Sequence, residues 1–126
     1  MATVLLDTNF VMTCARQKID FFHELFVSGF KIVVPKQVLE EMERVADKKN
    51  KKLKNRESAE LGLKLLSKNK SMFKIINLGK KHVDKLIVSY ANEHPRLIVA
   101  TLDSELKKKL KNKKMVIREK KRIAVI

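Results

Sequence analysis

Short apolar segments alternate with amphipathic segments along almost the whole chain. Six apolar runs have the length of strands: Thr3 to Leu6, Lys31 to Val34, Phe73 to Leu78, Leu97 to Thr101, Met115 to Ile117 and Ile123 to Ile126. Six patterns are helical: Asn9 to Arg16, Asp20 to Val27, Lys36 to Lys48, Arg56 to Ser67, His82 to Glu93 and Ser104 to Lys111. Continuously apolar strands joined by helices are typical of parallel sheets. The sequence therefore predicts an α/β protein, a three-layer sandwich with a central, mainly parallel sheet.

The 126 residues have the length of one domain, and three glycines and two prolines leave little room for a linker. We expect a single domain over residues 1–126. Cys14 is the one cysteine, so no intramolecular disulfide can form, and we expect a reducing, cytoplasmic environment. No apolar stretch approaches the ~18 residues that a membrane-spanning helix needs, so we expect no association with a membrane.

The charge of the chain is strongly unbalanced. It has 29 Lys and Arg against 14 Asp and Glu, a formal net charge of +15. Much of this charge lies in residues 48–56, 107–114 and 118–122. Lysine-rich surfaces also occur in thermophilic proteins, but there the number of acids rises with the number of lysines. Here it does not, which favours a polyanionic partner such as a nucleic acid.

Two aspartates follow predicted strands directly. Asp7 comes after Val4-Leu5-Leu6, and Asp103 comes after the strand that ends at Thr101. Ligands of parallel sheets bind at the carboxyl ends of the strands, which makes both aspartates candidates for a site. Both also precede predicted helices, where aspartate is a favoured N-cap. Taken singly, each position fits either role.

Two further acids lie at the margins of predicted helices. On a helical projection of residues 36–48, Glu40 points into solvent, whereas Glu41 and Glu43 lie at the two margins of the buried face. Geometry alone does not choose between them. Asp84 lies about 90° from the centre of its apolar helix face, near the helix N-terminus, where an acid also complements the helix dipole.

A cluster of such acids would need a cation. Like charges in one pocket repel and raise each other's pKa unless a cation neutralises them. Oxygen ligands suit Mg²⁺ or Mn²⁺. An acidic metal site on a basic protein is expected for phosphodiester hydrolysis, since lysines can hold the backbone phosphates while the metal activates water.

The acids and their neighbours resemble the motifs of the PIN-domain nucleases. The matching segments are Asp7-Thr8-Asn9, Val38-Leu-Glu-Glu41-Met, Val83-Asp84-x-x-Ile87 and Val99-Ala-Thr101-Leu-Asp103. The resemblance implies an α/β/α fold and cleavage of single-stranded RNA with Mg²⁺ or Mn²⁺. It assigns the catalytic, metal-binding acids to Asp7, Glu41, Asp84 and Asp103, and so chooses Glu41 over Glu43. It also implies that Thr8, Asn9 and Thr101 orient these carboxylates, although Thr101 also fits an ordinary strand end.

Within the family, the segment Val33 to Glu43 and the basic tail Val116 to Ile123 look most like archaeal VapC-like proteins related to nucleases that process small-subunit ribosomal RNA. This resemblance implies an RNA partner and, in many members, a homodimer. Two alternatives remain open: a toxin nuclease of a toxin–antitoxin pair, inhibited by a small antitoxin protein, and a non-catalytic RNA-binding module of the same fold.

The basic run 48–56 is either a solvated loop or an RNA clamp, and we favour the clamp. Its candidate RNA contacts are Lys48, Lys49, Lys51, Lys52, Lys54 and Arg56. The histidines share no metal-binding spacing, so none is expected to be catalytic. Four phenylalanines, Phe21, Phe22, Phe26 and Phe30, have mostly the spacing of a buried helix face, which favours core packing over base stacking.

Overall fold

The computed structural model describes residues 2–47 and 52–126, apart from the side chain of Lys120. The strands are β1 (Thr3–Leu6), β2 (Lys31–Pro35), β3 (Lys74–Ile76), β4 (Ile98–Ala100), β5 (Lys114–Arg118) and β6 (Arg122–Val125). The α-helices are α1 (Thr8–Arg16), α2 (Phe21–Val27), α3 (Lys36–Ala46), α4 (Leu53–Lys68), α5 (Val83–Glu93) and α6 (Ser104–Lys109), with short 3₁₀ turns at Lys70–Met72 and Glu119–Lys121. Across these residues, no helix is both long enough and apolar enough to cross a membrane.

All the strands pair in one sheet in the order β3-β2-β1-β4-β5-β6. The strands from β3 to β5 run parallel, and β6 pairs antiparallel with β5. The predicted α/β class with a mainly parallel sheet is confirmed. The chain runs outward from β1 in both directions, to β2 on one side and to β4 on the other. Parallel sheets bind their ligands beside the carboxyl ends of the strands at such a reversal, which here lies at the ends of β1 and β4.

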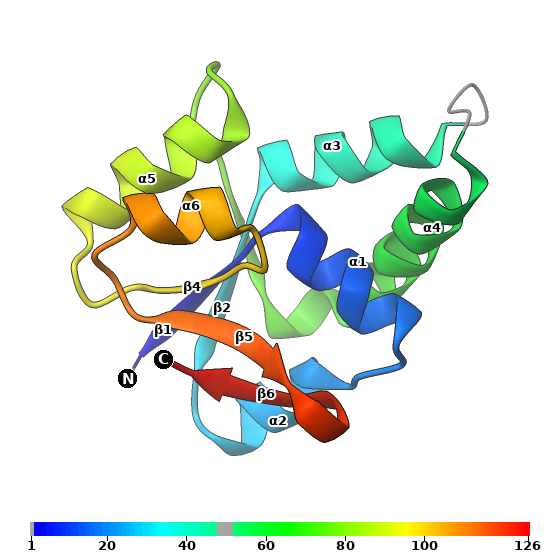
Figure 1. Cartoon of the computed structure of the whole chain (residues 1–126), viewed down its shortest axis with the longest axis horizontal. Coiled ribbons are helices and arrows are strands. Elements are labelled where there is room, and N and C mark those ends of the chain that lie inside the picture. Colours follow the sequence, from blue (N-terminus) through cyan, green and yellow to red (C-terminus); the bar gives the residue numbers. More distant parts are fainter. Residues whose placement is uncertain (1, 48–51) are drawn as a thin grey trace.

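Alternate side chains of each strand enter different cores, because successive side chains of a strand point to opposite faces. Val4 and Leu6 belong to the larger core, which also contains buried residues of α1, α2, α3 and α4. Leu5, between them, belongs to the smaller core under α5 and α6. The two groups of helices cover opposite faces of the sheet (Figure 1). This gives the three layers predicted from the sequence.

Helix α4 begins earlier than the sequence predicts. It starts at Leu53, so Lys54 and Arg56 lie in its first turns and not in a loop. The apolar side of α4 packs against α1 and α3, and Gly62 allows the close approach: a Cβ there would lie 3.1 Å from the Sδ of Met42. This packing allows α4 to begin among the charged residues of the basic run, before Arg56, where the sequence pattern predicts the helix to start. Residues 48, 49 and 51 of the predicted clamp lie outside the described residues.

The prediction of a buried phenylalanine face is partly wrong. Phe21 and Phe22 are fully buried and stack with ring centroids 4.4 Å apart. Phe26, in contrast, is 68 % exposed. Helix α2 has only seven residues and ends at Val27. Leu25 still lies in the larger core, whereas Phe26 and Val27 at the end of the helix are exposed.

Candidate active site

Asp7 lies where β1 ends and α1 begins, beside the carboxyl end of β4. Its backbone N–H donates to the carbonyl of Ala100, which continues the pairing with β4. Its Oδ1 accepts a 2.9 Å hydrogen bond from the N–H of Thr8, and its Oδ2 accepts a 2.8 Å hydrogen bond from the hydroxyl of Thr101. The residue is only 5 % exposed. Asp7 is therefore both the N-cap of α1 and a rigidly held carboxylate at the predicted edge of the sheet.

The pKa of Asp7 is raised from 3.8 to about 6. Burial is the main cause, because it penalises the charged carboxylate. The hydrogen bonds from Thr101 and Thr8 lower the pKa, whereas the negative charges of Asp84 and Glu41 raise it. Three of the four predicted acids thus interact electrostatically at one place.

Two polar side chains tie the end of β1 to the end of β4. The hydroxyl of Thr101, which donates to Asp7, also accepts a 3.2 Å hydrogen bond from the N–H of Asp103. Asn9 accepts a 3.2 Å hydrogen bond from the N–H of Leu102 through its Oδ1. Thr101 is therefore more than a strand end, since one hydroxyl connects both aspartate motifs. Asn9 fixes the β4–α6 loop against α1.

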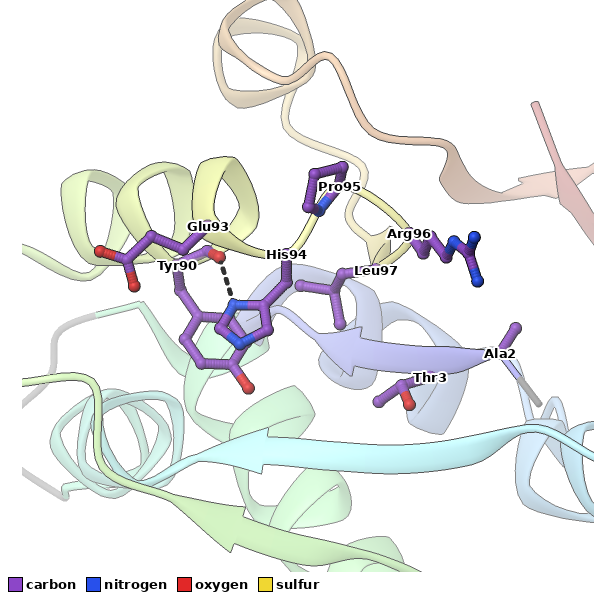
Figure 2. Close-up of a pocket in the computed structure, with 8 residues that line it drawn as sticks. All are labelled: Ala2, Thr3, Tyr90, Glu93, His94, Pro95, Arg96 and Leu97. Atoms are coloured by element: carbon purple, nitrogen blue, oxygen red, sulfur yellow. Dashed lines mark hydrogen bonds between the residues drawn. The ribbon is translucent and has the colours of Figure 1, made fainter.

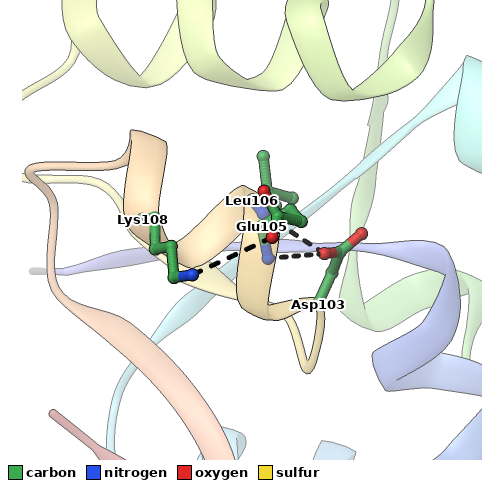
Figure 3. A network of polar contacts seen from close by, with 4 residues as sticks. All are labelled: Asp103, Glu105, Leu106 and Lys108. Atoms are coloured by element: carbon green, nitrogen blue, oxygen red, sulfur yellow. Dashed lines mark hydrogen bonds and ion pairs between the residues drawn. The ribbon is translucent and has the colours of Figure 1, made fainter.

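Asp103 caps α6. Its Oδ1 accepts hydrogen bonds from the N–H groups of Glu105 and Leu106, while its second oxygen points away from the helix (Figure 3). The capping role expected from the sequence is confirmed. Asp103 is not among the charges that shift the pKa of Asp7, and its link to Asp7 runs through Thr101.

Glu41 and Asp84 approach Asp7 from opposite layers of the sandwich. Glu41 is half-buried on α3, and Asp84 is exposed in the first turn of α5. Glu43, which the helical projection left open, is exposed, and it does not contribute to the shift of Asp7. Of the two glutamates, only Glu41 contributes to the raised pKa of Asp7.

The donor set fits a divalent cation in its chemistry. Carboxylate oxygens are preferred by Mg²⁺ and Mn²⁺, and a cation would relieve the repulsion that raises the pKa of Asp7. The hydroxyl of Thr8 is buried next to Asp7, and among the residues that the structure describes it has no hydrogen-bond partner. As the side chains stand, residues 2–47 and 52–126 contain no group of three His, Cys, Asp or Glu that could hold a metal ion. Closure on a cation would require Glu41 and Asp84 to turn toward Asp7.

A hollow of about 640 Å³ lies at the other edge of the sheet. It is lined by residues that precede β1 and β4 and by the end of α5, among them Tyr90, His94 and Arg96 (Figure 2). The Nδ1 of His94 lies 2.8 Å from the carbonyl oxygen of Tyr90, and the two rings stack. This hollow opens at the amino ends of the strands, away from Asp7. His94 thus closes the end of α5.

Comparison with known proteins gives consistent results. Residues 4–122 match the family described as "PIN like domain". Ribonuclease VapC4 of Methanocaldococcus jannaschii is 35% identical over 127 residues, which cover 96% of this chain and 94% of that protein. Two solved structures share the fold. One is the PIN domain endonuclease Utp24, with a TM-score of 0.73, 23% identity, and coverage of 98% of this chain and 90% of that chain. The other is VapBC2 from Rickettsia felis bound to a DNA fragment from their promoter, with a TM-score of 0.60, 17% identity, and coverage of 89% and 98%. The chain belongs to the PIN-like domain family.

Proposed function

We propose that this chain is a Mg²⁺- or Mn²⁺-dependent ribonuclease that hydrolyses phosphodiester bonds of single-stranded RNA. The observation that carries the proposal is the buried Asp7, whose pKa is raised by burial and by the charges of Asp84 and Glu41 at the carboxyl edge of the sheet. Burial of this carboxylate costs folding free energy, and the hydrogen bonds from Thr8 and Thr101 offset that cost only in part. A 35% identical relative is named as a ribonuclease, and the net charge of +15 suits an RNA substrate.

The acids have different roles in this proposal. Asp7 supplies a fixed oxygen, because Thr101 and Thr8 hold its carboxylate. Asp103 supplies the oxygen that does not cap α6, and Glu41 and Asp84 complete the set from α3 and α5. A bound divalent cation would polarise the scissile phosphate and lower the pKa of a water. Thr101 and Asn9 join the two strand ends, and the N–H of Thr8 holds Asp7, so that the carboxylates can converge on the cation.

The experiment is cleavage of a labelled single-stranded RNA with Mg²⁺, Mn²⁺ or EDTA. Asp7→Asn and Asp103→Asn should abolish a metal-dependent activity while RNA binding persists. Asparagine is also a good N-cap, so α6 should keep its first turn in the second variant. Equal cleavage by all three proteins would indicate a contaminant. RNA binding without cleavage by the wild type would favour the non-catalytic RNA-binding module.

Two glutamates on α3 provide a matched pair for the same assay. Glu41→Gln and Glu43→Gln remove the same charge two residues apart on one helix. Loss of activity is expected only for Glu41→Gln, because only Glu41 contributes to the environment of Asp7. An equal effect of both changes would mean that the net charge of α3, and not a metal ligand, controls the activity.

A toxin role is the second candidate, and the identity to Ribonuclease VapC4 favours it. In that case the RNA is cellular and a small antitoxin protein inhibits the enzyme. Expression of the wild type, but not of Asp7→Asn, should then arrest growth of a host. The resemblance to processing nucleases instead makes ribosomal RNA the substrate, and precursor cleavage without growth arrest would support it. A homodimer remains a prediction that sedimentation equilibrium can test.

A further inference from the structure

A concave basic surface lies beside Glu41, between α3 and the segment that leads into α5. We infer that this surface, here called the basic groove, binds backbone phosphates of the RNA strand next to the bond that is cleaved. The groove has a volume of about 420 Å³. Its polar lining consists of Glu41, Arg44, Lys80, Lys81, His82 and Lys85. The inference rests on the proposed function, since it concerns how the same site holds its substrate.

The charge of the basic groove is concentrated and uncompensated. Four cations, Arg44, Lys80, Lys81 and Lys85, face a single acid, Glu41. In residues 2–47 and 52–126, none of these four cations forms an ion pair. The ion pair found there joins Lys108 to Glu105 on α6, outside the groove. Positive charges gathered on concave walls focus the field and attract a polyanion more strongly than the same charges spread over a surface.

The segment that carries Lys80 and Lys81 is held in place by one amide on α3. The Nε2 of Gln37 donates 2.8 Å hydrogen bonds to the Oδ1 of Asn77 and to the carbonyl of Gly79. The Oε1 of Gln37 accepts a 3.1 Å hydrogen bond from the N–H of Leu78. Gly79 has a φ of +120°, a backbone conformation that favours glycine. The groove is therefore organised before a ligand arrives, which lowers the entropy lost on binding.

The basic groove leads directly to the acids. Glu41 forms part of its wall and also contributes to the raised pKa of Asp7. A second hollow, of about 250 Å³, lies between α5 and α6, with Asp84, Ser89 and Asn92 in its lining. Lys85 lines both hollows, so they meet across the first turn of α5. A strand whose phosphates lie in the basic groove would pass over Glu41 and Asp84 on its way to the second hollow.

Two other lysines provide a matched control. Lys64 and Lys68 line a hollow between α4 and the end of α1, together with apolar residues such as Leu61. Both are exposed, like Lys80 and Lys81, so removing either pair changes the net charge equally. Their hollow lies beside the end of α1 that points away from Asp7. Any difference between the two double variants therefore reports position and not total charge.

The test is the salt dependence of binding to a fluorescent single-stranded RNA, measured in EDTA so that no cleavage occurs. Each phosphate contact on a single strand contributes about 0.7 to the slope of log affinity against log salt concentration. Lys80→Ala with Lys81→Ala should reduce the slope by about 1.4 and the affinity by about 25-fold at 0.1 M salt. Lys64→Ala with Lys68→Ala should leave both near the wild-type values. The arginine pair Lys80→Arg with Lys81→Arg should restore the slope.

The outcomes separate this inference from the proposed function. If the wild type cleaves RNA but the two alanine pairs have the same slope, the basic groove does not bind the strand and the ribonuclease proposal stands. If the wild type never cleaves RNA but only the Lys80 and Lys81 alanine pair lowers the slope, the ribonuclease proposal fails and the groove stands as a phosphate-binding surface. Failure of the arginine pair to restore the slope would also overturn the inference, because a phosphate site accepts either cation.

Discussion

The two edges of the parallel sheet are built in opposite ways. At the carboxyl edge, Asp7 is buried, and its pKa of about 6 shows that the folded chain disfavours its charge. At the amino edge, the buried amide of Asn112 donates to the carbonyls of Ala91, His94 and Leu97 over distances of 2.9 to 3.2 Å. One edge buries an ionisable group at a cost, and the other satisfies its buried carbonyls with a neutral side chain.

This difference indicates that the amino edge stabilises the fold, whereas the carboxyl edge is suited to binding a ligand. A neutral donor that satisfies several carbonyls stabilises the end of α5 and the start of β4, with no charge left to neutralise. A buried acid close to two other acids destabilises the metal-free fold unless something binds it. Local conflicts of this kind are expected at functional sites, where binding of a ligand compensates them. The contrast supports the proposal that the carboxyl edge is the reactive edge, and it can be tested at both edges.

The largest expected effect is on the pH dependence of stability. The pKa of Asp7 is higher in the folded chain, about 6, than the ordinary 3.8, so the folded state binds more protons between these values. The free energy of unfolding that Asp7 contributes is fully present below about pH 4. It falls as the pH rises to about 6 and then stays constant. The loss is about 3 kcal/mol at 1.36 kcal/mol per pKa unit. Urea unfolding of the metal-free protein at pH 4, 5 and 7 measures it.

Asp7→Asn is the control for this experiment, because it keeps the shape and removes the charge. Other groups titrate in both proteins, so the difference between the two curves isolates Asp7. The variant should be more stable than the wild type at pH 7 although it is inactive. Mg²⁺ or Mn²⁺ should stabilise only the wild type, by RT ln(1 + [L]/Kd). A variant that loses stability at pH 7 would contradict the view that the acid is costly.

At the amino edge, Asn112→Ala should lower the free energy of unfolding by about 2–3 kcal/mol. The change removes the side-chain donor from the buried carbonyl oxygens of Ala91 and Leu97, and that of Ala91 keeps only the backbone N–H of His94. Lys111→Ala, at the exposed neighbouring position, should have little effect. Asn112→Asp should destabilise as well, because a carboxylate there would face carbonyl oxygens. Chemical denaturation of the three variants measures the order, and a harmless Asn112→Ala would remove the contrast between the edges.

Thr101→Val should affect the reaction more than the fold. Valine fills the same space, but it cannot donate to Asp7 or accept from the N–H of Asp103. Since the Thr101 hydrogen bond lowers the pKa of Asp7, its loss should raise that pKa further in the metal-free protein. Activity should fall by about 10- to 100-fold, the usual effect of losing a group that orients a metal ligand.

Thr101→Ser provides the comparison, because it keeps the hydroxyl and loses only a methyl group. It should retain most of the activity, and NMR titration of Asp7 should give a pKa near that of the wild type. If Thr101→Ser were as inactive as Thr101→Val, packing of the methyl group would matter more than the hydrogen bond. The role of Thr101 in orienting Asp7 would then be wrong.

Much of the carboxyl edge was predictable from sequence, because strand ends of a parallel sheet converge. Asp7 follows β1 directly and Asp103 lies in the short loop after β4, so their position requires only the correct fold class. The choice between Glu41 and Glu43 needed more than periodicity, since both lie at margins of the same helix face. The family motif chose Glu41, and the structure places that residue near Asp7.

The remaining features depend on contacts between distant segments. Asn112 has no periodic signal, because its partners lie 15 to 21 residues away in a turn with no recognisable motif. Phe26 fits an apolar helix face, and its exposure follows from where the core ends. The basic groove could not be predicted from the sequence, because the position of Lys80 and Lys81 depends on hydrogen bonds from Gln37, a distant residue on α3. The lysines themselves are visible in the sequence, but their placement opposite Arg44 is not.

The smallest expected effect concerns the rings at the end of α5. Tyr90 and His94 stack with centroids 4.1 Å apart at the amino edge, away from the acids. Tyr90→Leu keeps an apolar side chain and removes the stacking, so the free energy of unfolding should fall by about 0.5–1 kcal/mol. A double-mutant cycle with His94→Ala isolates the coupling between the rings. RNA cleavage should be unchanged, because the pair stabilises the edge that takes no part in the reaction. A large loss of cleavage by a folded Tyr90→Leu variant would place part of the active site at the amino edge. The proposed contrast between a reactive carboxyl edge and a structural amino edge would then be wrong.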